Sequence, residues 1–112
     1  MITQRFEDPI FAAIEAHRKA FFECEEYGTD ENIVRLSDIE KEALIALLDQ
    51  APTTIAGVAA LSRYSAELTA LFSRTGWDRP VTHSDDGQRS MDWSYYIHRN
   101  IADAVVKLTA AA

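Results

Sequence analysis

Three histidines and one cysteine are the side chains of this 112-residue sequence best suited to metal binding or nucleophilic chemistry. His17, His83 and His98 lie far apart, and no Glu-x-x-His or His-x-x-x-His pair occurs. Because metal sites in helical bundles need ligands three or four residues apart on one face, we expect no metal and no cofactor. Cys24 lies on the apolar stripe of the first predicted helix, where a thiol behaves as a small hydrophobe. The sequence also has no nucleophile elbow and no glycine-rich phosphate loop, so we expect no catalytic residue and lean against an enzyme.

His17 is the most informative of these residues, because it falls where a hydrophobe is expected. It belongs to an apolar stripe at helical spacing, which contains Ile10, Ile14, His17, Phe21 and Cys24. Two interpretations stay open: a core histidine bonded to a neighbouring helix, or a polar group that lines a pocket or senses pH. His98 borders the apolar face of the last predicted helix, and the same two interpretations apply to it.

The helix that carries His17 has clear boundaries in the sequence. Asp8 can accept hydrogen bonds from free backbone N–H groups, and Pro9 loses no hydrogen bond at the first helical position. Glycine readily adopts the left-handed conformation that ends many helices, so we expect this helix to end at Gly28.

A second helix is predicted between Ser37 and Pro52. Ser37 and Glu40 have the spacing of a capping box, in which each side chain bonds the backbone of the other. The run 43–48 is apolar on all sides, and such helices are normally buried on all sides. We therefore place this helix at the centre of the fold.

Two further helices follow. The third is expected from Thr53 or Thr54 to Gly76. Gly57 inside it indicates the close approach of another helix or, as the alternative, a ligand that lies against the bare backbone. The fourth is expected over about 90–109, with an inner face of Trp93, Ile97, Ile101, Ala104, Val105 and Leu108.

These elements predict an all-α fold, a four-helix up-and-down antiparallel bundle. The length suits one domain over 1–112, with a flexible arm at 1–7 and the longest loop at 77–89, where Asp85-Asp86-Gly87 signals a turn.

Charge and composition narrow the range of partners. The net charge is −7 and no basic patch is evident, which disfavours nucleic acid. The densest charge cluster is acidic, at 23–31, and it is either a solvated helix end or a surface for a basic partner. No signal peptide or membrane span is predicted, and the single cysteine suits a reducing compartment, so we expect a cytoplasmic protein with a protein partner.

Two segments resemble a group of short, uncharacterised bacterial all-helical proteins. They are 8–18, Asp-Pro-Ile-Phe-Ala-Ala-Ile-Glu-Ala-His-Arg, and 52–61, Pro-Thr-Thr-Ile-Ala-Gly-Val-Ala-Ala-Leu, continuing to Tyr64. The resemblance implies an all-helical fold and a bacterial source, and it implies no activity. Within these segments His17, Arg18 and Tyr64 exceed what folding requires, so they are the candidates for a shared site.

Three hypotheses about function remain. The first is a non-catalytic interaction module, because Phe11 and Phe22 give the first helix more apolar surface than one neighbour would cover; a homodimer is its simplest form. The second is a small-molecule binder or minor enzyme, with a pocket near His17, Tyr64 and His98.

The third hypothesis is a winged-helix-like DNA-binding regulator. It requires a turn at 62–65, a recognition helix at 66–75 and a wing around 85–87. The proposed recognition helix offers only Arg74, with Arg63 nearby, and the apolar stripe from Val58 to Phe72 is unbroken. Both features favour one continuous helix.

Overall fold

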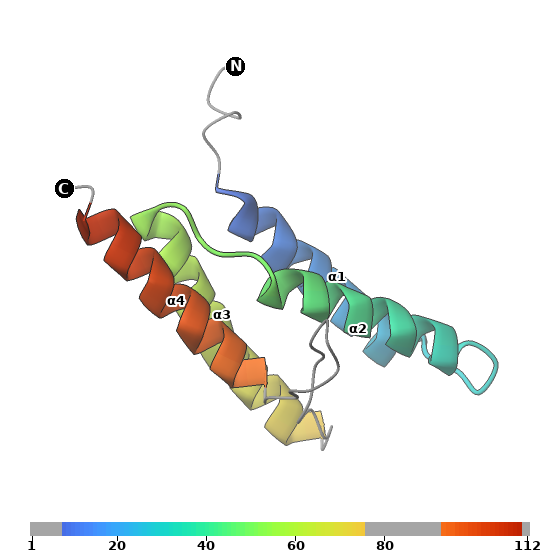
Figure 1. Cartoon of the computed structure of the whole chain (residues 1–112). Helices are drawn as coiled ribbons and strands as arrows, with labels where there is room; N and C mark the ends of the chain where they lie inside the picture. The colour runs from blue at the N-terminus through green and yellow to red at the C-terminus, as the bar shows by residue number, and fades with distance from the viewer. Residues whose placement is uncertain (1–7, 76–92, 111–112) are drawn as a thin grey trace, which may run out of the picture.

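The computed structural model describes residues 8–75 and 93–110 (Figure 1). In those residues the elements are four helices: α1 (Pro9–Tyr27), α2 (Ile33–Leu48), α3 (Ile55–Thr75) and α4 (Trp93–Ala110). The predicted all-α class and the four-helix bundle are confirmed. The predicted arm at 1–7, the loop at 77–89 and the turn at 85–87 lie outside the described residues.

The helices form two pairs, α1 with α2 and α3 with α4, which lie side by side (Figure 1). Between the pairs, α1 contacts α3 and α2 contacts α4. No Cα atom of α2 lies within 8 Å of one in α3, and the chain between these consecutive helices crosses from one pair to the other. The antiparallel up-and-down order of all four helices stays a prediction.

α1 begins and ends where the sequence predicts, but its end has a different cause. Asp8 caps the helix through a hydrogen bond from the Ile10 N–H to Oδ1 at 3.1 Å. Gly28 follows the last residue with φ −68° and ψ 130°, so the predicted left-handed conformation is wrong. Glycine is needed there for space, because a Cβ would lie 2.5 Å from the Cys24 carbonyl oxygen and 2.6 Å from Ile33 Cδ1.

α2 begins at Ile33, so the capping box predicted at Ser37 is wrong. The helix starts from a turn in which the Thr29 carbonyl accepts from the Ile33 N–H at 2.8 Å. The Asn32 side chain closes this turn by accepting from the Thr29 N–H at 2.6 Å. Glu40 therefore lies inside the helix, and its side chain points to α1 instead of back to Ser37.

The central placement of α2 is also wrong. Its buried apolar residues are Leu44, Leu47 and Leu48, which form one face, whereas Ala46 is exposed within the apolar run. An apolar run of six small and aliphatic residues contains more hydrophobic surface than the two neighbours α1 and α4 cover. The core is shared by all four helices, with Ile10, Phe21, Leu47, Leu61, Leu68 and Ile97 among its fully buried members.

Only part of the predicted inner face of α4 is buried. Trp93, Ile97 and Ala104 are buried, but Val105 is 41% exposed, which contradicts its predicted place in the core. The buried position that was missed is Asn100, whose Nδ2 donates to the Leu48 carbonyl at 2.7 Å. An amide can be buried there because it satisfies an otherwise free carbonyl at the end of α2.

The carboxylate of Asp8 joins the beginnings of α1 and α3. Its Oδ2 accepts from the Thr53 N–H at 2.8 Å and from the N–H and hydroxyl of Thr54 at 2.9 Å each. The Thr54 Oγ1 in turn accepts from the Gly57 N–H at 2.9 Å, which caps α3. Asp8 is 2% exposed, so this one buried side chain fixes two helix ends, and α1 and α3 start together.

Gly57 of α3 lies directly against the Asp8 carboxylate at this joint. A Cβ at Gly57 would overlap Asp8 Oδ2 and lie 2.7 Å from Asp8 Cγ and 3.0 Å from Ile10 Cγ2. The expected close approach at Gly57 is therefore present, and it comes from the Asp8 carboxylate as well as from α1 itself.

Replacing Gly57 with alanine is expected to destabilise the protein, although the same change inside a helix normally adds about 1 kcal/mol. The Asp8 carboxylate cannot retreat without losing its donors, so we expect a net loss of roughly 1–2 kcal/mol. Urea unfolding followed by circular dichroism measures this. The exposed neighbour Ala56 is the control, since Ala56→Gly should lose about 1 kcal/mol from helix propensity alone. A more stable Gly57→Ala variant would show that Asp8 moves freely.

Candidate functional site

A buried chain of three polar side chains links α1, α2 and α3. His17 Nε2 lies 2.6 Å from Glu40 Oε2, and His17 Nδ1 lies 2.6 Å from the Tyr64 hydroxyl. All three side chains are at most 2% exposed. We call this set the Glu40–His17–Tyr64 chain.

The protons in this chain can be assigned from its hydrogen bonds. Burial, assisted by the negative charge of Glu67, raises the pKa of Tyr64 well above its ordinary value, so the phenol stays protonated. We assign this hydroxyl as the donor to Nδ1, because a buried O–H needs an acceptor and His17 is its described partner. Nε2 then carries the ring hydrogen and donates to the Glu40 carboxylate.

These contacts match the core-histidine interpretation of His17. Both ring nitrogens are bonded to neighbouring helices, and the ring packs between Phe21 and Tyr64 at centroid distances of 6.2 and 5.9 Å. His17 is fully buried and, unlike Tyr64, does not line the groove between α1 and α3 that is described below. His98 lies exposed on α4 and does not join the other candidates.

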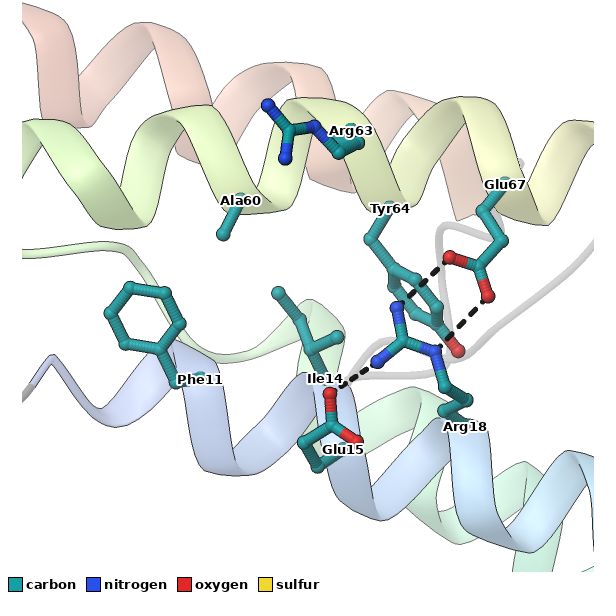
Figure 2. A pocket seen from close by; sticks show the side chains of 8 residues that line it. All are labelled: Phe11, Ile14, Glu15, Arg18, Ala60, Arg63, Tyr64 and Glu67. Atoms are coloured by element: carbon teal, nitrogen blue, oxygen red, sulfur yellow. Dashed lines mark hydrogen bonds and ion pairs between the residues drawn. The ribbon is translucent and has the colours of Figure 1, made fainter.

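Arg18 and Tyr64, the other two candidates, come together on the outside of this chain. The Arg18 guanidinium lies over the Tyr64 ring, 4.9 Å from its centroid. It also bridges to α3, donating from Nε to Glu67 Oε2 at 3.1 Å and from Nη2 to Oε1 at 2.9 Å, and it bonds Glu15 on its own helix (Figure 2). The hydrogen bonds with Glu67 hold the pKa of Arg18 above and that of Glu67 below their ordinary values. Arg18 is thus a neutralised cross-link between α1 and α3.

A groove of about 430 Å³ lies between α1 and α3 beside this cross-link (Figure 2). Phe11 and Ile14 line it from α1 and Ala60 from α3, while the bridge from Arg18 to Glu67 crosses it. Arg63 also lines the groove, and it has no partner among the described residues. The groove therefore combines an apolar surface with one guanidinium, that of Arg63, which makes no ion pair with a described residue.

α3 is continuous through the segment where a helix-turn-helix would need its turn. Residues 62–65 are helical, within the unbroken span of α3. The continuity that the apolar stripe favoured is confirmed, and the DNA-binding hypothesis loses the turn on which it was built.

Sequence reasoning missed Glu40 as a core residue, although a signal was present. Glu40, Leu44 and Leu47 follow one another at spacings of four and three, as His17 does with its own apolar neighbours. A charged residue on such a stripe predicts a buried partner, but here the capping-box interpretation was preferred. Glu67 and Arg63 carry no comparable signal, because charged residues on an outer face are common.

The described residues hold no group of three or more histidine, cysteine, aspartate or glutamate side chains suited to a metal ion. None of their helices is long and apolar enough to cross a membrane. No protein family, curated protein or solved structure matches this chain.

Proposed function

We propose that this chain is a non-catalytic helical interaction module, and that its docking surface is the tip of the α1–α2 pair. The tip consists of the end of α1, the turn at 28–32 and the start of α2. Its exposed apolar side chains are Phe22, Tyr27, Ile33 and Val34, which are 46%, 66%, 38% and 71% exposed. Large exposed aromatic and aliphatic residues gathered at one end of a molecule are typical of interaction surfaces. Four exposed large apolar side chains within the single stretch 22–34 are the observation that carries the proposal.

The charge of the tip favours a basic partner over a second copy of the chain. Residues 20–34 contain Glu23, Glu25, Glu26, Asp30 and Glu31 and no lysine or arginine. Two tips facing each other would bring like charges together, which opposes association. A partner with basic residues around an apolar patch would complement both features. The homodimer expected from the sequence is the alternative.

The burial of the Glu40–His17–Tyr64 chain supports a role without catalysis. The three polar groups satisfy one another and leave no reactive atom accessible. As part of the same proposal we place the protein in a bacterial cytoplasm, since the buried, unpaired Cys24 suits a reducing compartment.

Site-specific photo-crosslinking in the host tests the docking surface. A photoreactive phenylalanine analogue at Tyr27 is expected to capture one reproducible protein with a basic surface, in a yield that falls as salt is raised. The same analogue at Ala102, exposed on α4, is the matched control and should capture none. Capture of the chain itself would replace the basic partner with a homodimer. Equal capture at both positions, or none at Tyr27, would overturn the docking surface.

A further inference from the structure

We propose that the groove between α1 and α3 binds a small organic monoanion with an apolar body, such as an aryl-substituted short-chain carboxylate. This site is separate from the tip of the α1–α2 pair and does not depend on the function proposed for it. It is built from residues of the first half of α1 and the middle of α3.

The apolar part of the ligand is indicated by the floor of the groove. Phe11, Ile14 and Ala60 face the hollow from the two helices, and the small side chain of Ala60 leaves room opposite the Phe11 ring (Figure 2). A hollow of about 430 Å³ lies within the range of small-molecule sites, roughly 300–1,000 Å³. An aromatic or branched aliphatic group would displace water from this surface.

The charge of the ligand follows from the ion pairs in the groove. Its lining holds two carboxylates, Glu15 and Glu67, and both are bound to Arg18. Their combined charge with Arg18 is one negative, and Arg63 brings the total charge of the lining to zero without itself being part of an ion pair. Arg63 has no ionic partner among the described residues, so its guanidinium is free to pair with a ligand carboxylate. A guanidinium presents two parallel N–H groups, which both oxygens of a carboxylate can accept; an amide offers one uncharged carbonyl oxygen, and a protonated amine offers no acceptor.

The other two polar side chains of the groove are already occupied. The Tyr64 hydroxyl is bonded to His17, and the Arg18 guanidinium is held by Glu67 and Glu15. The Arg18 bridge therefore forms a fixed end wall, and the ligand would lie between this wall and Phe11. We expect the carboxylate at Arg63 and the apolar body over Ile14 and Ala60.

Binding of three matched probes to the full chain tests the proposal. The probes are 4-phenylbutyrate, its neutral amide and 4-phenylbutylamine, followed by amide chemical shifts of the labelled protein. We expect saturable shifts at residues of the groove with 4-phenylbutyrate and about fivefold weaker binding of the amide. The amine should bind no better than the amide. Equal affinity for all three probes, or no binding of 4-phenylbutyrate at millimolar concentration, would overturn the proposal.

Two variants and one control locate the site. Arg63→Gln should remove the preference for the carboxylate over the amide, and Ala60→Leu should weaken all three probes by filling the hollow. Arg35→Gln, at an exposed arginine of α2 outside the groove, should leave every affinity unchanged. Circular dichroism verifies that each variant is folded. Unchanged binding by Arg63→Gln would show that another group holds the carboxylate and would overturn the assignment.

Discussion

His17→Leu is expected to lower the free energy of unfolding by about 3–5 kcal/mol, a large part of the total for a domain of this size. Leucine fills the space of the imidazole but bonds neither neighbour. The Glu40 carboxylate, whose described side-chain partner is His17, would be left buried without a donor, and the Tyr64 hydroxyl without an acceptor. Urea unfolding at neutral pH, followed by circular dichroism, measures the loss.

The same substitution at His98 is the matched control. His98 is exposed on α4, so His98→Leu should change the stability by no more than about 0.5 kcal/mol. A triple variant, His17→Leu with Glu40→Leu and Tyr64→Phe, should recover much of the loss, because it removes all three polar groups together. If His17→Leu alone costs under 1 kcal/mol, water or another side chain must satisfy Glu40, and the chain does not hold the three helices together.

The buried faces of the helices could be predicted from the sequence because periodicity depends only on local spacing. All of Ile10, Ile14, His17, Phe21 and Cys24 are buried, as their stripe predicts. The partner across a helix interface is not a local property. The stripe placed His17 inward, but nothing in its own helix indicates that Glu40 and Tyr64, 23 and 47 residues away, would meet its two nitrogens.

The start of α2 shows how one local signal can hide another. The spacing of Ser37 and Glu40 fits a cap, and the spacing of Glu40 and Leu44 fits a buried stripe. Which of them holds depends on where the helix begins. That point is set by the turn at Thr29–Asn32, whose hydrogen bonds start the helix upstream of Ser37.

The sequence predicted the two parts of the joint at Asp8, the cap of α1 and the start of α3, only separately. The sequence marked Asp8 as a cap for α1 and Thr53 or Thr54 as the start of α3, yet not that one carboxylate would serve both. Segments 8–18 and 52–61 contain both parts. Further along, α1 and α3 meet again where Arg18 bonds Glu67 beside Tyr64. The residue pattern of the two segments thus has a physical explanation as one interface between α1 and α3.

Asp8→Ala is expected to lose about 3 kcal/mol of the free energy of unfolding, more than a surface helix cap contributes. The variant removes the cap of α1, and it leaves the Thr53 and Thr54 N–H groups without their acceptor. Asp8→Asn should lose less of the free energy of unfolding, because the asparagine side chain keeps one oxygen as an acceptor. It should still lose some, because its NH₂ group would face the backbone N–H donors. Asp38→Asn, at an exposed position of α2, is the control and should change little.

The loss of stability in Asp8→Asn should also depend on pH, in a defined direction. Burial opposes ionisation of Asp8, but the hydrogen bonds from Ile10, Thr53 and Thr54 outweigh it and lower the pKa of the carboxyl below its ordinary value. A carboxyl with a depressed pKa in the folded state stabilises the protein above its unfolded pKa, near 3.9, and this contribution is lost as the pH falls through the folded value. The stability difference between wild type and Asp8→Asn should therefore be constant above about pH 5 and shrink below about pH 4. A difference that stays constant down to acid unfolding would mean that the Asp8 carboxylate is not held in its ionised form by the two helix ends.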